Sequence, residues 1–368
     1  PRSVRECALA HSFDRKVGKK MERIHVKVPG EQPQDREYMK QALALAEKGH
    51  GWVNPNPMVG AVLVKDGHII GEGYHTRYGQ LHAEREAFKN AAERGEETAG
   101  ADLYVTLEPC CHTGKQPPCT EAVLASGVKR VIVGCTDPNP VVAGRGIRLL
   151  REKGLEVVAG VLRGECERQN EVFFHFMRTK LPFTVLKYAM TLDGKTATVS
   201  GESQWITGEA ARKRVHEDRG RYMAILTGVS TVLADNPQLT CRIPGGKNPI
   251  RVIADTKLRT PLSSTVVQTA RETPTWIVTA VSDTGRKKAY EDAGCRVLSV
   301  PAKEGELDLQ AMMQRLGEEK VDSVMVESGG TLAWSFLKVG LCCYPIINLR
   351  RTNWRRKLCN RLFRSVRL

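Results

Sequence analysis

The sequence lacks several features that would place it in a specialised class. It has no stretch of about 18 uninterrupted apolar residues, so no membrane-spanning helix is expected. It has no short-period repeat of the kind that builds solenoids, and no apolar signal segment precedes a small-residue cleavage site. The composition is that of an ordinary globular protein, with 41% hydrophobic and 26% charged residues. At about 150 residues per domain, the 368 residues suggest two domains.

Acidic residues are scarce at both ends of the chain. Of the net charge of +15, +9 lies in residues 328–368 and +4 in 1–34, so residues 35–327 carry only +2. Nucleic-acid enzymes usually carry positive charge on a folded face. The central chain is therefore interpreted as a near-neutral enzyme with a small-molecule substrate, and nucleic acid is not an expected partner. RNA binding by the basic tail, with Trp354 and Phe363 interleaved, is kept as an alternative.

Cysteine is frequent, but the pattern does not suggest disulfides. The 11 cysteines are odd in number and irregularly spaced. A disulfide framework is unexpected in a chain this long and this rich in core residues. We expect a reducing, cytoplasmic protein in which some thiols bind a metal and others are small buried side chains.

Hydrophobic periodicity predicts two α/β units that meet at Leu181-Pro182. In the first unit, Asp35 caps a helix and Asp66-Gly67 forms a hairpin turn. Further strands are predicted at 59–64, 103–107, 131–134 and 155–159, and helices at 81–94, 120–126, 147–153 and 165–177. In the second unit, strands are predicted at 184–190, 223–227, 250–254, 275–279, 296–300 and 322–326, and helices at 209–219, 284–293, 308–316 and 331–339.

The strongest chemical signal is His82 together with Cys110 and Cys119. A catalytic zinc uses three protein ligands and keeps one position open for water. Glu84 lies two residues after His82, where it can exchange protons with that water and with a leaving amine. This combination is typical of the zinc nucleobase deaminases. A purely structural zinc site, with Cys111 or His112 as a fourth ligand, is the less favoured interpretation.

Several segments resemble the bifunctional riboflavin-biosynthesis deaminase/reductase family. In the first unit these are residues 54–60 (NPNPMVG), 73–75 (GYH) and 108–121 (EPCCHTGKQPPCTE). In the second they are 187–195 (KYAMTLDGK), 200–207 (SGESQWIT) and 228–242 (GVSTVLADNPQLTCR). The resemblance covers about residues 35–340.

The resemblance implies a fold and two activities. The expected fold is an α/β chain with a cytidine-deaminase-like three-layer sandwich followed by a dihydrofolate-reductase-like domain. The first domain would use Zn²⁺ to deaminate 2,5-diamino-6-ribosylamino-4(3H)-pyrimidinone 5′-phosphate. The second would use NADPH to reduce the ribosyl side chain to ribityl. A tRNA or deoxycytidylate-type zinc deaminase with an appended domain is the alternative enzyme, and a homo-oligomer is possible.

The resemblance also assigns residues to these reactions. In the deaminase, His82, Cys110 and Cys119 would bind zinc and Glu84 would move the proton. Substrate contacts are expected from Asn54, His75 and Lys115 in the deaminase, and from Ser203, Arg219, Leu239, Arg242 and Glu327 in the reductase. Cofactor contacts are expected from Ala189, Trp205, Thr231, Asp235, Gly329 and Gly330.

The resemblance ends near Gly340, where the composition changes abruptly. The family continues with further strands, whereas this chain becomes rich in arginine. The predicted organisation is therefore a disordered leader at 1–34, a deaminase domain at 35–180, a truncated reductase domain at 181–340 and an atypical basic tail at 341–368. Loss of the closing strands would leave an unpaired sheet edge and make the reductase activity doubtful.

Overall fold

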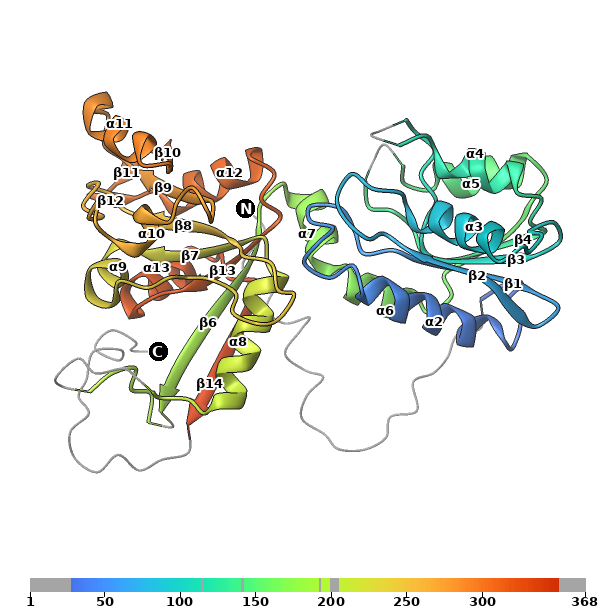
Figure 1. Ribbon diagram of the computed structural model, residues 1–368, viewed down its shortest axis with the longest axis horizontal. Coiled ribbons are helices and arrows are strands. Elements are labelled where there is room, and N and C mark those ends of the chain that lie inside the picture. Colours follow the sequence, from blue (N-terminus) through green and yellow to red (C-terminus); the bar gives the residue numbers. More distant parts are fainter. Residues whose placement is uncertain (1–27, 114–115, 140–141, 192, 199–204, 351–368) are drawn as a thin grey trace.

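The computed structural model describes residues 28–350, except 114–115, 140–141, 192 and 199–204. Two α/β units lie next to each other, each with its own central sheet (Figure 1). The leader at 1–34 is described only from residue 28, and the tail only to residue 350. In the part of the chain that is described, no helix is both long and apolar enough to cross a membrane.

The N-terminal unit is a three-layer sandwich around a five-stranded sheet of order β2-β1-β3-β4-β5. Strand β1 is antiparallel to both β2 and β3, whereas β3, β4 and β5 run parallel. Helices α2 and α6 cover one face of the sheet and α3, α4 and α5 cover the other (Figure 1). The strands are β1 Gly60–Lys65, β2 His68–Tyr74, β3 Asp102–Leu107, β4 Arg130–Cys135 and β5 Glu156–Ala159; the helices are α2 Asp35–Glu47, α3 Ala83–Glu93, α4 Cys119–Ala125, α5 Arg145–Glu152, α6 Arg163–Gln169 and α7 Glu171–Thr179.

Helix α3 packs very closely on β2 because both contact surfaces carry small residues. Ala83, Ala87 and Ala91 are fully buried on the sheet side of the helix. A Cβ atom at Gly73 of β2 would lie only 2.3 Å from the Ala83 carbonyl oxygen and 2.3 Å from the Ala87 amide nitrogen. The absence of a side chain at Gly73 therefore sets the position of the first turn of α3.

The C-terminal unit is built on a parallel seven-stranded sheet of order β10-β9-β8-β7-β13-β6-β14. Helices α12 and α13 contribute to the core on one face, and α9, α10 and α11 to the core on the other. The strands are β6 Phe183–Thr191, β7 Ala224–Gly228, β8 Ile250–Ala254, β9 Thr275–Thr279, β10 Arg296–Ser299, β13 Ser323–Glu327 and β14 Tyr344–Arg350, with a separate hairpin of β11 Ala302–Lys303 and β12 Glu306–Leu307. The helices are α8 Glu209–Arg221, α9 Val229–Asp235, α10 Thr265–Gln268, α11 Thr284–Asp292, α12 Leu309–Glu318 and α13 Gly330–Lys338.

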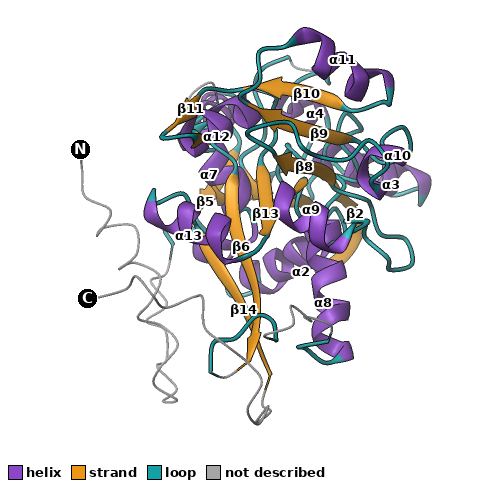
Figure 2. Cartoon of the chain, turned by 90° about the vertical axis from the view of Figure 1, so that its left-hand side faces the viewer, coloured by secondary structure: helices purple, strands orange, loops and turns teal. Residues whose placement is uncertain are grey.

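The C-terminal segment corrects the expectation of an unpaired edge. Residues Tyr344–Arg350 form β14, which pairs in parallel with β6 from Val185 to Thr191. Figures 1 and 2 both show β14 beside β6. The altered sequence after Gly340 thus supplies an edge strand, and the reductase sheet extends ten residues beyond the predicted boundary.

The helix predicted at 165–177 is two helices, because Asn170 interrupts it. The side-chain Nδ2 of Asn170 donates to the Met58 carbonyl, and its Oδ1 accepts from the Met58 backbone amide, both at 2.8 Å. These bonds tie the junction of α6 and α7 to the segment before β1. After α7, β6 begins at Phe183, so residues 180–182 connect the two units.

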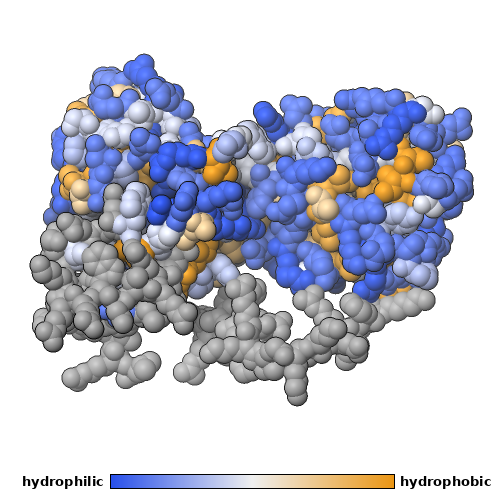
Figure 3. All heavy atoms as spheres, turned by 60° about the horizontal axis from the view of Figure 1, so that its bottom comes forward, coloured by the Kyte–Doolittle hydropathy of each residue, from blue (hydrophilic) through white to orange (hydrophobic). Residues whose placement is uncertain are grey.

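The surface in view in Figure 3 is mostly hydrophilic, with apolar residues in a few small groups. Exposed large apolar side chains include Trp334, Leu337 and Val339 in and after α13, and Ile347 of β14.

Candidate active site

Three elements bring His82, Cys110 and Cys119 together. His82 is the N-cap of α3, Cys110 follows β3, and Cys119 is the first residue of α4. Their ligand atoms all lie within 4.8 Å of one another. The His82 Nδ1 atom is 3.5 Å from Cys110 Sγ and 3.3 Å from Cys119 Sγ. Tetrahedral zinc separates such ligand atoms by about 3.5 Å, so this donor set fits zinc.

Glu84 lies in the first turn of α3, two residues beyond His82. Its side chain is buried, and burial raises the pKa of its carboxyl group. Glu84, His82 and Cys110 line one cavity, and the buried Cys119 lies next to His82 and Cys110. A carboxyl group beside a metal-ligand cluster in a cavity is placed to exchange protons with a bound molecule.

The cavity has a volume of about 550 Å³ and is walled by both domains. On the deaminase side it is lined by Asn56, His75, Glu108, Asp137 and Asn139, among others. The remaining wall comes from Lys180, in the connection, and from Gly317, Glu318 and Lys320 at the end of α12. Residues on both sides of the predicted domain boundary at 180/181 therefore form the wall of this cavity.

His75 orients Asn56 at the cavity wall. The His75 Nδ1 atom is 3.0 Å from the Leu81 carbonyl oxygen, which can only accept, so Nδ1 carries the proton. Burial lowers the pKa of His75 and favours the neutral ring. Its Nε2 atom then accepts from Asn56 Nδ2 at 3.2 Å. Both ring nitrogens already have partners, so His75 supports Asn56 at the cavity wall, and its predicted contact with the substrate stays a prediction.

Asn54 lies away from the cavity lining. Its Nδ2 atom donates to Asp322 Oδ2 of the other domain at 2.7 Å. The neighbouring Asn56 is the residue that reaches the cavity, and the repeated Asn-Pro pattern at 54–57 was the signal that could have indicated it. Lys115 falls outside the described residues.

Glu108 and Asp137 form a part of the cavity that sequence reasoning missed. The Glu108 carboxylate accepts from the backbone amides of Asp137, Gly144 and Ile147 at 2.8–3.2 Å, which closes the loop after β4. Burial raises the pKa of Asp137 to about 6. The segment Asp137-Pro-Asn139 after a buried strand was the available signal, because strand ends commonly carry polar site residues.

In the second unit, Arg219 and Glu327 are brought together. Arg219 of α8 donates to both carboxylate oxygens of Glu327, at 2.8 and 3.0 Å, and to the Thr240 carbonyl at 3.0 Å. Lys187 of β6, which the sequence indicates only as part of the 187–195 segment, lies opposite Glu327 with its Nζ atom 3.7 Å from Oε2. Burial would raise the pKa of Glu327, but Arg219 and Lys187 hold it below its usual range.

The other predicted reductase residues that the structure describes lie on β6, on and after α9, at the start of α13 and before α8. Leu239 is buried and Arg242 is exposed on the loop that provides Thr240. Thr231 and Asp235 lie on α9 after β7, Gly329 and Gly330 begin α13 after β13, and Ala189 lies on β6. Trp205 is 59% exposed and stacks with the Arg212 guanidinium at 4.6 Å. Ser203 lies outside the described residues.

The carboxyl ends of neighbouring parallel strands are where α/β sheets bind dinucleotides. Strands β7, β13 and β6 are neighbours in the sheet. A Cβ atom at Gly228, before α9, would contact Leu332 of α13, so these two helix starts are adjacent. Among the described residues, no atom beyond the adjoining chain lies within 4 Å of a Cβ built at Gly329, which leaves room for a ligand against the backbone. These features fit a dinucleotide.

Fold and site together define a zinc-dependent deaminase joined to an α/β reductase. The chain matches two family profiles: the cytidine and deoxycytidylate deaminase zinc-binding region over residues 32–135, and the RibD C-terminal domain over 182–342. The second match ends close to Gly340, where the composition changes. The chain belongs to the RibD family of bifunctional riboflavin-biosynthesis enzymes, and its cofactors are Zn²⁺ and NADPH.

Relatives match over most of their length. The riboflavin biosynthesis protein RibD of Actinobacillus pleuropneumoniae is 50% identical over 307 residues, covering 83% of this chain and 81% of that protein. The Escherichia coli protein of the same name is 43% identical over 321 residues, covering 84% and 85%. A crystal structure of the deaminase/reductase from Thermotoga maritima is 41% identical, with a TM-score of 0.78 and coverage of 88% and 89%. Acinetobacter baumannii RibD is 37% identical, with a TM-score of 0.81 and coverage of 91% of each chain.

These comparisons confirm the predicted α/β fold and the bifunctional assignment. None of them favours RNA binding or a tRNA or deoxycytidylate-type enzyme with an unrelated appended domain.

Proposed function

We propose that His82, Cys110 and Cys119 bind the zinc and that Glu84 is the proton carrier of the deaminase. The substrate is 2,5-diamino-6-ribosylamino-4(3H)-pyrimidinone 5′-phosphate, and its exocyclic amine is replaced by a carbonyl oxygen. The observation that carries the proposal is the cluster of His82, Cys110 and Cys119, which meets Glu84 at a cavity of about 550 Å³. When bound, zinc supplies the Lewis acidity that activates a water molecule.

The chain's own residues account for binding and proton movement. Glu84 accepts a proton from the attacking water and delivers it to the departing amine, which leaves as ammonia. Asn56, held by neutral His75, contacts the edge of the pyrimidine ring in place of Asn54. The ring then lies between Asn56 and the zinc ligands, and the cavity excludes bulk water.

For the second reaction, we propose that the starts of α9 and α13 would hold NADPH, which would supply the hydride that reduces the open-chain ribose, with a proton taken up from solvent. Arg219 has its charge compensated by Glu327, so Arg242, exposed on the adjacent loop, is the better phosphate partner. The cluster of Arg219, Glu327 and Lys187 then orients the sugar hydroxyls beside the nicotinamide.

Two substitutions test the deaminase assignment. Cys110→Ser is expected to lose bound zinc and ammonia release together. Glu84→Gln is expected to keep zinc, measured by elemental analysis, while its kcat falls about 10²–10⁴-fold. Zinc-loaded Glu84→Gln protein with wild-type turnover would contradict the mechanism.

We further propose a reducing, cytoplasmic location and small-molecule partners. The buried cysteines Cys135, Cys166, Cys241 and Cys295 are free thiols. Detection of the protein with its thiols reduced in the cytoplasmic fraction would test the location. Sedimentation would test for a homo-oligomer.

A further inference from the structure

The deaminase loop at residues 49–57 is held by the reductase domain. This loop joins α2 to β1 and supplies Pro55, Asn56 and Pro57 to the cavity wall. Asn54, at its centre, donates from Nδ2 to Asp322 Oδ2 at 2.7 Å. Lys247 Nζ donates to the Gly51 carbonyl at 3.4 Å.

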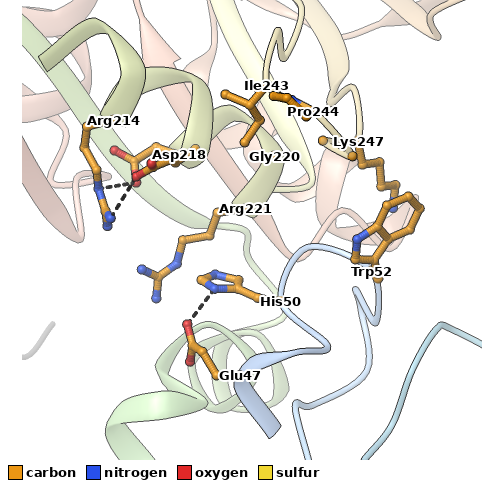
Figure 4. Close-up of a pocket in the computed structure, with 13 residues that line it drawn as sticks. Glu47, His50, Trp52, Arg214, Asp218, Gly220, Arg221, Ile243, Pro244 and Lys247 are labelled. Atoms are coloured by element: carbon orange, nitrogen blue, oxygen red, sulfur yellow. Dashed lines mark hydrogen bonds and ion pairs between the residues drawn. The ribbon is translucent and has the colours of Figure 1, made fainter. Parts of the chain in front are cut away.

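Close packing adds to these two polar contacts. A Cβ atom at Gly51 would lie 2.1 Å from the Gly220 carbonyl oxygen of α8, and Gly51 has a φ of +76°. Lys247, Trp52 and Gly220 line an interdomain cleft of about 280 Å³ (Figure 4). The loop therefore lies against the reductase domain at Gly51 and again at Asn54, on either side of Trp52.

Asp322 is a rigid anchor. It lies immediately before β13, in the middle of the reductase sheet, and only 1% of it is exposed. Its Oδ1 accepts from Ser323 Oγ at 2.6 Å, and its backbone carbonyl accepts from the Phe183 amide at 2.7 Å. Its second carboxylate oxygen is used by Asn54 of the other domain. A buried carboxylate needs such partners, which fixes the direction from which Asn54 can approach.

From Asn54 the contacts continue to the zinc ligands. Asn56 follows Asn54 by two residues, with Pro55 restricting the backbone between them. Asn56 bonds to His75, and His75 bonds to the carbonyl of Leu81, the residue before His82. The His75 and His82 rings also meet edge to face, with centroids 5.5 Å apart. A substitution at Asp322 would therefore displace Asn56 first and would not alter the candidate metal ligands directly.

We propose that Asp322 of the reductase domain is a positioning residue for deamination, holding the 49–57 loop so that Asn56 meets the substrate ring. The inference rests on the proposed function of the cavity. It implies that the deaminase site is complete only when the reductase domain is in place, which agrees with the contribution of Gly317, Glu318 and Lys320 to the cavity wall.

The test uses the full-length chain and exchanges the two hydrogen-bonding partners. In Asn54→Asp, two carboxylates face each other, and kcat/KM for ammonia release is expected to fall at least about tenfold, as for other supporting partners of a metal site. The loss should appear mainly in KM, because Asn56 contacts the ring in the ground and transition states alike. The loss of kcat/KM in Asp322→Asn alone should be smaller, since the side-chain amide of Asn54 can rotate to keep a hydrogen bond with the introduced amide. The double variant Asn54→Asp/Asp322→Asn restores an N–H···O bond and should recover most of the loss.

Zinc content and NADPH oxidation with the deaminated substrate should stay within about twofold of wild type in all three variants. Asp308→Ala is the matched control, because Asp308 caps α12 in the same domain through the Gln310 and Ala311 amides and does not contact the loop. It should lower the stability of the reductase domain while leaving deamination unchanged.

Two results would overturn the inference. One is wild-type KM and kcat for deamination in Asn54→Asp. The other is a double variant as impaired as Asn54→Asp, which would show that the pair does not act through its bond. Neither result would bear on the zinc mechanism, which depends separately on the behaviour of Glu84→Gln.

Discussion

Gly73→Ala is an informative change because α3 packs closely on β2. The substitution adds only a methyl group, but that group would press on the first turn of α3, next to the candidate zinc ligand His82. The new Cβ would lie 2.3 Å from Ala83 O and Ala87 N. Ordinary contact requires about 3.4 Å, so the first turn of α3 must move by about 1 Å or the strand must distort. Both atoms belong to backbone, so no side-chain rotation relieves the clash.

The expected outcome combines a modest loss of stability with a large loss of activity. Overpacking of this kind costs about 1–3 kcal/mol of unfolding free energy. Because His82 and Glu84 lie at the start of α3, a shift of about 1 Å misplaces the proposed metal ligand and the proposed proton carrier, and such misplacement costs about 10²-fold in rate. The assay is kcat/KM for ammonia release at saturating zinc, together with zinc affinity.

Gly164→Ala is the control for this experiment. Gly164 is an exposed residue of α6 in the same domain, and a Cβ there approaches only the end of the Arg168 side chain, at 3.4 Å. It should leave deamination unchanged and stabilise the helix by a few tenths to about 1 kcal/mol. If Gly73→Ala retained the kcat/KM of Gly164→Ala, the argument that Gly73 sets the position of the catalytic turn would be refuted.

Two further predictions concern the reductase domain. Arg251 is fully buried and donates six hydrogen bonds to neutral acceptors, so Arg251→Leu leaves several carbonyls unsatisfied at about 1–3 kcal/mol each. Urea unfolding should show that the free energy of unfolding falls by at least about 4 kcal/mol. A urea midpoint equal to that of Arg286→Leu, the control at an exposed site, would contradict this prediction. Ending the chain at Cys343 removes β14 and should lower the rate of NADPH oxidation at least about tenfold, because β6, which carries Lys187, loses its backbone partners. Ending the chain after Arg350 keeps β14 and should not lower this rate. Equal rates for the two chain lengths would show that β14 is dispensable.

Local sequence determined the elements of both domains and pointed to the candidate zinc ligands. The strands at 250–254 and 275–279 agree with the prediction to the residue, because continuous apolar runs between turn residues are recognisable in a parallel sheet. His82, Cys110 and Cys119 were also identified from residue types and spacing, since few chemistries use one imidazole and two thiolates in this order.

The tertiary structure decided which of several suitable side chains reaches each site. Asn54 and Asn56 are equivalent by sequence pattern, but only Asn56 lines the cavity, because Asp322, 268 residues after Asn54, binds the Asn54 amide. Arg219 matches a phosphate ligand by type, yet Glu327 compensates its charge. The segment at 344–350 has an atypical composition but still forms an edge strand, because the exposed backbone groups of β6 provide hydrogen-bonding partners whatever its side chains. These outcomes depend on contacts between residues distant in sequence, which local patterns do not encode.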